Sequence, residues 1–254
     1  MNRPLTSCWP FEAEAAFSLT FDDGPPSQLK MAVPMLNNAD LQATFYVNPK
    51  GDDFAEKLAP WKEVAKAGHE IGSHTMAHIC SVAFRNDPDA PGLEKMTLDD
   101  IEKDIVESKR RLQQIVPDQK EMSFCYPCYM EHVGCGPTRQ SYVPVVAKHH
   151  IAGRGKGEFP FANHPATVDL HYAWSWPAER MPGSQMVGLV EACVANNRWG
   201  ILTFHGIHEG NLSVAQGDLR ELINYLEANH SRIWTAPVAK VARRILDWRK
   251  ENGI

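Results

Sequence analysis

The 254-residue sequence predicts an α/β protein of about seven strand–helix units, close to the number in an α/β barrel. Short apolar strands alternate with helical patterns along the chain, and no repeat, low-complexity tract or linker interrupts them. Polar residues that can carry chemistry follow several predicted strands at their C-terminal ends, where barrel proteins gather such groups. Because barrels of this length are commonly one domain, we expect a single catalytic domain over residues 1–254.

The predicted elements alternate in order. Strands are expected at residues 15–21, 43–49, 69–75, 122–127, 150–155, 199–207 and 232–238, and helices at 28–38, 54–68, 97–116, 138–148, 185–195 and 219–229, with a last helix at the C-terminus. The clearest helix is 97–116, because Thr97 can cap its first turn and Asp100 occupies the capping-box position. Segment 199–207 is almost wholly apolar, as a strand buried on both faces is.

Charge, hydropathy and the N-terminal sequence bear on whether the protein binds nucleic acid, spans a membrane or is secreted. The net charge of -5 argues against nucleic acid, whose binders usually carry a basic stripe. No apolar run is long enough for a membrane span. The first 17 residues lack the pattern of a signal peptide, so we expect a cytoplasmic protein or a trimmed secreted product. The sequence makes no prediction about oligomeric state.

Asp22 and Asp23 follow the first predicted strand directly. An Asp-Gly turn ending the strand would account for one carboxylate. Two adjacent carboxylates at a buried strand end repel each other unless a positive group lies beside them. The doublet therefore favours a functional site over a simple turn.

His74 and His78 end the third predicted strand. If the chain turns helically there, an i, i+4 spacing lets both imidazoles face the same way. Two imidazoles and one carboxylate make the three-ligand set of a catalytic zinc site, with the fourth position left for water. Eleven histidines make chance pairs common, so the pair gains its weight from the carboxylates at an equivalent strand end.

His205 ends the most apolar strand, where a polar residue needs a partner or an opening onto a cavity. A hydrogen-bonded core histidine is the plainer interpretation, but the position at the same rim favours an acid or base. His208, three residues later, is expected to face solvent.

The six cysteines do not form a disulfide scaffold in a chain of this length. Cys125 and Cys128 form a C-x2-C pair, for which a zinc knuckle or a redox pair is conceivable. A zinc knuckle would normally need a second matching pair of cysteines, and the sequence has none. The favoured interpretation is that these are small residues lining a loop in a reducing compartment.

The motifs TFDDG, SHTMAH and LTFHG, in this order, resemble the polysaccharide deacetylases, the NodB-homology group of carbohydrate esterase family four. The resemblance extends from about residue 16 to the final helix. It implies a distorted (β/α) barrel of about seven units. It also implies that Asp22 is the catalytic base, that Asp23, His74 and His78 bind one divalent metal, most often zinc, and that His205 is the general acid.

One motif departs from the family. Where the family commonly has Arg-x-Pro-Tyr, this chain has Cys125, Tyr126, Pro127 and Cys128. The backbone N–H of Cys128 can replace that of the family tyrosine as oxyanion donor. The missing arginine would leave Asp22 without a partner that orients it, and we expect Arg154 to reach the rim and replace it.

The expected function is therefore removal of N-acetyl groups from a poly- or oligosaccharide. Tyr126, Pro127, Arg154, Trp174 and Trp176 are candidates for contact with the sugar, although core packing would equally explain the aromatic residues. The altered motif leaves other activities open. The same frame could act on O-acetyl esters or on a non-carbohydrate amide or ureide, or the chain could be an inactive carbohydrate-binding relative.

Overall fold

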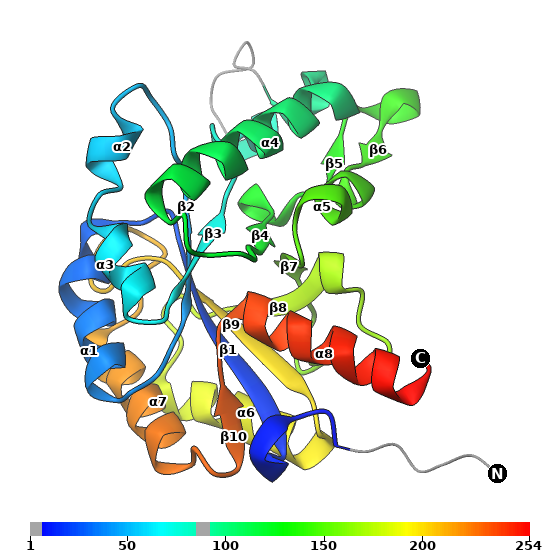
Figure 1. Ribbon diagram of the computed structural model, residues 1–254. Coiled ribbons are helices and arrows are strands. Elements are labelled where there is room, and N and C mark those ends of the chain that lie inside the picture. The colour runs from blue at the N-terminus through cyan, green and yellow to red at the C-terminus, as the bar shows by residue number, and fades with distance from the viewer. Residues whose placement is uncertain (1–6, 85–91) are drawn as a thin grey trace.

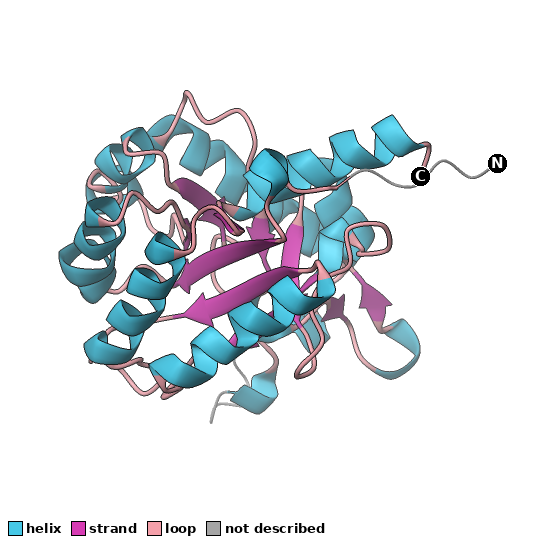
Figure 2. Ribbon diagram, turned by 90° about the horizontal axis from the view of Figure 1, so that it is seen from below, coloured by secondary structure: helices cyan, strands magenta, loops and turns pink. Residues whose placement is uncertain are grey.

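The computed structural model describes residues 7–84 and 92–254. Residues 1–6 and 85–91 lie outside the described residues. The first of these segments belongs to the 17 residues that lack a signal-peptide pattern. Seven parallel strands close into a barrel, because β9 pairs back onto β1 (Figures 1 and 2). In ring order they are β1 (Ala15–Asp22), β2 (Thr44–Val47), β3 (Glu70–Ser73), β4 (Phe124–Cys125), β7 (Gly153–Lys156), β8 (Ala173–Pro177) and β9 (Trp199–Phe204). The predicted distorted barrel of about seven units is confirmed.

Helices pack around this ring (Figure 2). They are α1 (Val33–Asn38), α2 (Phe54–Lys57), α3 (Trp61–Lys66), α4 (Leu98–Ile115), α5 (Val143–His149), α6 (Gly183–Asn196), α7 (Gln216–Ala228) and α8 (Val238–Asn252), and a π-helix, Gln28–Ala32, leads into α1. The capping box predicted for α4 is present, since the Thr97 hydroxyl accepts from the Asp100 N–H at 3.2 Å and the Asp100 carboxylate from the Thr97 N–H at 2.9 Å. Within the described ranges, no helix combines the length and apolar character needed to cross a bilayer.

The two faces of the barrel strands carry different side chains. On β1, Phe17, Leu19 and Phe21 belong to the apolar cluster beneath the helices. The alternating residues Ser18 and Thr20 are buried and hydrogen-bond to the carbonyls of residues 236 and 202, in the segments beside β1. Since successive strand residues face opposite ways, the largest apolar cluster lies between barrel and helices, and the barrel interior is polar near the C-terminal ends of the strands.

Two differences from the predicted strands concern the ring itself. The final predicted strand exists as β10 (Ile233–Thr235), but it pairs only with the first half of β1 and lies outside the ring. Its place in the count of seven is taken by β8, which was not predicted because its tryptophan- and proline-containing segment shows no strand pattern. The ring is weakest at β4, which meets β3 through a single residue pair.

Two predicted helices are also corrected. The predicted helix over 54–68 is two short helices, since Pro60 lacks the N–H that a helix interior needs. The predicted helix over 138–148 begins only at Val143. The chain before it forms a two-stranded antiparallel hairpin, β5 (His132–Val133) with β6 (Gln140–Ser141).

Stability should fall as the pH decreases from about 6.5 to about 4, because the fold buries neutral His69. Its Nδ1 accepts from the Ala43 N–H at 3.0 Å, so the proton is on Nε2, 2.9 Å from the Asn37 side-chain oxygen. Burial lowers the pKa of His69 from 6.5 to about 4. In that interval the unfolded chain binds more protons than the folded chain, so acid favours unfolding.

Thermal unfolding measured from pH 7 to pH 4 tests this expectation. His69→Gln should show a smaller decrease in Tm than the wild type, while exposed His230→Gln should follow the wild type. Equal slopes in all three proteins would contradict the assignment to His69.

Candidate active site

The first strand delivers two carboxylates in different directions. Asp22, the last residue of β1, is buried and follows the inward alternation of Ser18 and Thr20. Asp23 has a φ of 70°, and Gly24 after it a φ of 64°. This left-handed turn ends the strand, and the Asp23 side chain is 43% exposed. The turn thus leaves one carboxylate inside the barrel and one at its mouth.

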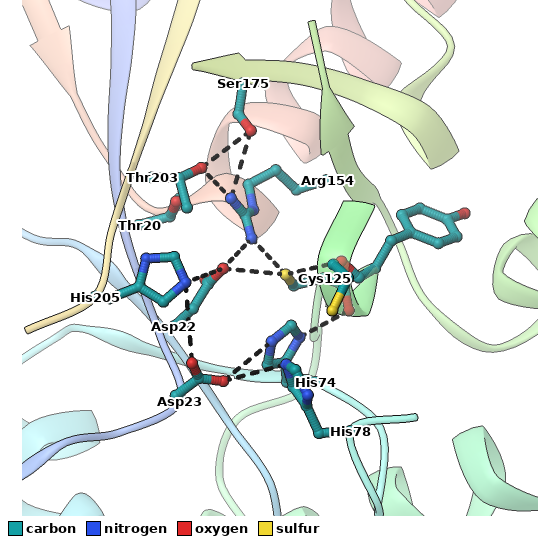
Figure 3. A network of polar contacts seen from close by, with 12 residues as sticks. Thr20, Asp22, Asp23, His74, His78, Cys125, Arg154, Ser175, Thr203 and His205 are labelled. Atoms are coloured by element: carbon teal, nitrogen blue, oxygen red, sulfur yellow. Dashed lines mark hydrogen bonds and ion pairs between the residues drawn. The ribbon is translucent and has the colours of Figure 1, made fainter. Parts of the chain in front are cut away.

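Asp23, His74 and His78 lie together at this mouth (Figure 3). The Nε2 atoms of both histidines are 3.4 Å from Asp23 Oδ1. One ligand atom from each residue lies within 4.8 Å of the other two. The structure therefore brings together the three residues predicted as metal ligands.

The donor set fits a metal ion. Two ligands held about 2.1 Å from a tetrahedral zinc lie roughly 3.4 Å apart, which is the spacing found here. The Nδ1 atom of His74 lies 3.0 Å from the Cys125 carbonyl, which can only accept, so Nδ1 carries a proton. In the neutral ring the Nε2 lone pair then faces the Asp23 carboxylate, an arrangement that requires a cation between them.

The pKa values of Asp23 and His74 agree with this need for positive charge, whereas burial and the charge of His74 lower the pKa of His78. Burial would raise the pKa of Asp23, but the hydrogen bond and charge of His74, with the charges of His78 and His205, outweigh it and lower the pKa to about 2. Burial would lower the pKa of His74, but the surrounding negative groups raise it well above 6.5.

The loop that carries the two histidines is held in a strained form. Thr75 and His78 have φ values of 61° and 49°, which cost non-glycine residues about 1–3 kcal/mol each. Asn48, just beyond β2, donates to the Thr75 carbonyl at 2.9 Å, and Asp104 of α4 accepts from the Met76 N–H at 2.7 Å. Both supporting residues were missed from the sequence, although the polar Asn48 follows a buried strand as the Asp doublet does.

Arg154 lies in the polar part of the barrel interior, on the side of Asp22 that faces away from the predicted metal ligands (Figure 3). It is fully buried, and its Nη2 lies 2.6 Å from Asp22 Oδ2 and also contacts Cys125 Sγ. Its Nη1 contacts the hydroxyls of Thr203 and Ser175. The expectation that Arg154 reaches Asp22 agrees with this contact. Its candidacy for binding substrate is wrong, because it has no exposed surface.

Cys125 lies where the family arginine is expected. Its sulfur is 3.5 Å from Asp22 Oδ2, and its register partner on the next strand is Arg154. The guanidinium therefore comes from β7 instead of β4. Asp22 Oδ1, also buried, has no hydrogen-bond partner among the described residues. One Asp22 oxygen is thus held by Arg154 and the other is free to accept.

His205 follows β9 and is 20% exposed, with Nε2 at 4.0 Å from Asp22 Oδ2 and 3.9 Å from Asp23 Oδ2. Buried Gln28, from the π-helix, donates to the carbonyls of Asp22 and His205 at 2.7 and 3.0 Å. This amide ties the ends of β1 and β9 together and fixes the spacing of the two predicted proton carriers. Gln28 was not singled out from the sequence, where it reads as an ordinary helix residue.

The cysteines differ from the favoured interpretation. Cys128 forms a disulfide with Cys80, 48 residues earlier, so it is not a free loop residue. It does not pair with Cys125, whose buried thiol contacts Asp22 and Arg154, so neither a C-x2-C redox pair nor a knuckle forms there. Cys128 and the residue after it have φ values of 53° and 58°. The disulfide joins the loop after the metal histidines to the loop that carries the predicted oxyanion donor.

Three of the predicted sugar-contacting residues are corrected. Tyr126 is buried, packs against Phe124 and Tyr142, and donates to the His171 carbonyl at 2.7 Å. Pro127 and Trp176 are buried as well. Core packing, the plainer interpretation, applies to all three.

Trp174 is exposed but lies elsewhere. It is 42% exposed and lines a cavity of about 870 Å³ on the outer wall, together with Phe161, Asp169 and Arg198. None of the metal ligands, Asp22 or His205 lines this cavity. Trp174 alternates with Ser175, whose hydroxyl faces the barrel interior, so the indole points outward.

Comparison with known proteins agrees with this geometry. Residues 12–129, just under half of the chain, match the family model described as polysaccharide deacetylase. Over this segment the chain is similar to the polysaccharide deacetylases. The matched segment carries both carboxylates, the two histidines predicted as metal ligands and the altered Cys125–Cys128 motif.

Two curated relatives of that family match over shorter segments. YheN of Bacillus subtilis, itself provisionally assigned as a polysaccharide deacetylase, is 33% identical over 95 residues, 37% of this chain and 32% of its own length. A peptidoglycan-N-acetylglucosamine deacetylase of Bacillus cereus is 38% identical over 69 residues, 26% of this chain and 30% of its own length. The matches thus span about a third of these relatives.

The fold similarity covers the whole chain. A protein of Pseudomonas aeruginosa PAO1, also assigned as a polysaccharide deacetylase, superposes with a TM-score of 0.66. The alignment covers 100% of this chain and 97% of the other at 13% identity. The similarity in fold therefore extends to the C-terminal half, beyond the residues that match the family model.

Proposed function

We propose that this chain is a metal-dependent hydrolase that removes N-acetyl groups from a poly- or oligosaccharide. The observation that carries the proposal is that the Nε2 atoms of His74 and His78 both lie 3.4 Å from Asp23 Oδ1, beside a second, buried carboxylate. The relation to polysaccharide deacetylases, one of them named for peptidoglycan N-acetylglucosamine, supports the choice of substrate class.

Asp23, His74 and His78 would hold the metal, which the donor set and the family favour as zinc. A bound divalent cation supplies two things here, a water pKa lowered toward about 7 and a polarised acetyl carbonyl. Two imidazoles and one carboxylate would supply three ligands, and the partial exposure of Asp23 and His78 would leave solvent access for a water, as a catalytic site requires.

The remaining steps belong to the chain's own residues. Asp22 accepts the proton of the attacking water through its free Oδ1, while Arg154 holds Oδ2 and orients the carboxylate. The Cys128 N–H donates to the developing oxyanion, a contribution of about 3 kcal/mol where such a donor is well placed. His205, protonated, delivers a proton to the departing nitrogen, which leaves as the free amine with acetate as the other product.

Removal of metal should abolish acetate release from N-acetylated chitooligosaccharides or peptidoglycan fragments, and added Zn²⁺ should restore it. Metal analysis of the purified protein, combined with acetate assays before and after chelation, measures this. Asp23→Asn and His74→Ala should lose both metal and activity, whereas the exposed His208→Ala should keep both. Full activity in metal-free protein would refute the proposal.

The same assay separates the competing activities. Release of acetate from acetylated xylan alone would indicate an O-acetyl esterase. Metal and glycan binding without any acetate release would indicate an inactive relative.

A further inference from the structure

The Cys80–Cys128 disulfide lies directly behind the metal ligand His78. Cys80 is buried, and its sulfur is 3.8 Å from His78 Nδ1. The Cys128 sulfur belongs to the same group, since one ligand atom each from His78, Cys80 and Cys128 lies within 4.8 Å of the others. Nothing in the proposed hydrolysis uses these two sulfurs.

His78 therefore has a different environment at each ring nitrogen. Its Nε2 faces the Asp23 carboxylate at 3.4 Å, and its Nδ1 faces Cys80. The first side offers nitrogen and oxygen ligands. The second side would offer nitrogen and two thiolates if the disulfide were broken, a set that zinc binds well.

We propose that the Cys80–Cys128 disulfide conceals a second metal site, formed on reduction by His78 Nδ1 and the two cysteine thiolates. A dithiol reductant opens it by thiol–disulfide exchange. The Sγ–Sγ bond breaks, two electrons and two protons pass to the cysteines, and the reductant is oxidised to its own disulfide. A thiophilic divalent cation, Zn²⁺ or Co²⁺, then displaces the thiol protons.

The two sites share one imidazole. A neutral imidazole has a single lone pair, so His78 serves the Asp23–His74 side or the cysteine side but not both. Reduction in the presence of zinc thus withdraws a ligand from the first site. Joining the two sites through His78 makes the redox state of Cys80 and Cys128 a control on metal placement.

Cobalt titration of His74→Ala tests the second site by itself, because this variant lacks a ligand of the first site. The oxidised variant should bind Co²⁺ weakly and without thiolate-to-cobalt charge-transfer absorption. After dithiol treatment and removal of the reductant, it should bind about one Co²⁺ per chain with that absorption. Absence of the absorption from the reduced, folded variant would overturn the proposal.

Cysteine variants in the same background identify the sulfur ligands. Cys80→Ser and Cys128→Ser should each remove the absorption, while Cys135→Ser, at an exposed free cysteine, and Cys125→Ser should keep it. Persistence in Cys80→Ser would equally overturn the proposal. If His74→Ala does not fold, Asp23→Asn replaces it. Since no step measures acetate, the result is independent of whether the chain is a deacetylase.

Discussion

Asp22→Asn is expected to keep its metal and to lower kcat by about 10²–10⁴-fold, the range that a general base contributes. An amide cannot accept the proton of the attacking water, while Asp23, His74 and His78 remain unchanged. Acetate release and metal content, measured on the same sample, test this. Loss of metal together with activity would instead assign Asp22 to the metal ligands.

The same substitution should also destabilise the fold, which must be separated from its effect on catalysis. Arg154 is fully buried and its charge partner is Asp22 at 2.6 Å, so an amide leaves an uncompensated charge at a cost on the order of 3 kcal/mol. Adding Arg154→Gln to Asp22→Asn removes that charge and should recover much of the lost Tm. Activity should remain low in the double variant. Recovery of activity along with Tm would show that Asp22 acts only through stability.

Local patterns predicted the barrel well where they were strong. The helix from Leu98 to Ile115 has a capping box and a regular apolar stripe, and the apolar run of β9 has no other interpretation. The β8 strand was missed because its tryptophan- and proline-containing segment shows no strand pattern, and the outward-facing Trp174 is 42% exposed. The predicted number of barrel strands was right, but one of the predicted strands, β10, lies outside the ring and β8 takes its place. Local sequence patterns do not reveal which strands pair around a ring.

The meeting of Asp23, His74 and His78 could be predicted because each residue follows a strand, and parallel strands end at one rim. The polar contacts inside the barrel could not be predicted in the same way. The alternation of Ser18, Thr20 and Asp22 along the first strand does indicate a polar face that points inward. Local sequence patterns do not show which charged side chain pairs with Asp22, because Asp22 and Arg154 lie far apart in sequence. The disulfide partner of Cys128 depended on a loop contact across 48 residues, which spacing cannot reveal.

Arg154→Ser is expected to lower kcat/KM by about 10–100-fold, the usual effect of removing a group that orients an active-site side chain. It leaves the buried Asp22 carboxylate unpaired, so stability should fall by about 3–5 kcal/mol as well. The metal should remain, because no metal ligand contacts the guanidinium directly among the contacts described. Acetate kinetics, metal content and thermal unfolding measure the three effects.

Placing the arginine on β4 instead of β7 tests whether Asp22 needs only a guanidinium beside it or needs one that comes from β7. Cys125 and Arg154 are register partners, and both contact Asp22 Oδ2. In Cys125→Arg with Arg154→Ser, the new arginine enters the space that the old one vacates, so most of the lost activity and Tm should return. Cys125→Arg by itself should be destabilised, because two guanidinium groups would then share one buried carboxylate.

Rescue by the exchanged pair is a result that a purely structural role would not produce, provided kcat recovers together with Tm. If Tm returns while kcat stays low, the charge supports folding only, and Asp22 takes its orientation from elsewhere. If neither kcat nor Tm returns, the arginine must come from β7. Thr203 of β9 and Ser175 of β8, which contact Arg154, then help to orient its guanidinium toward Asp22. Arg154→Lys separates these cases further, because an ammonium supplies the charge without the planar fork that reaches Asp22, Cys125 and both hydroxyls at once.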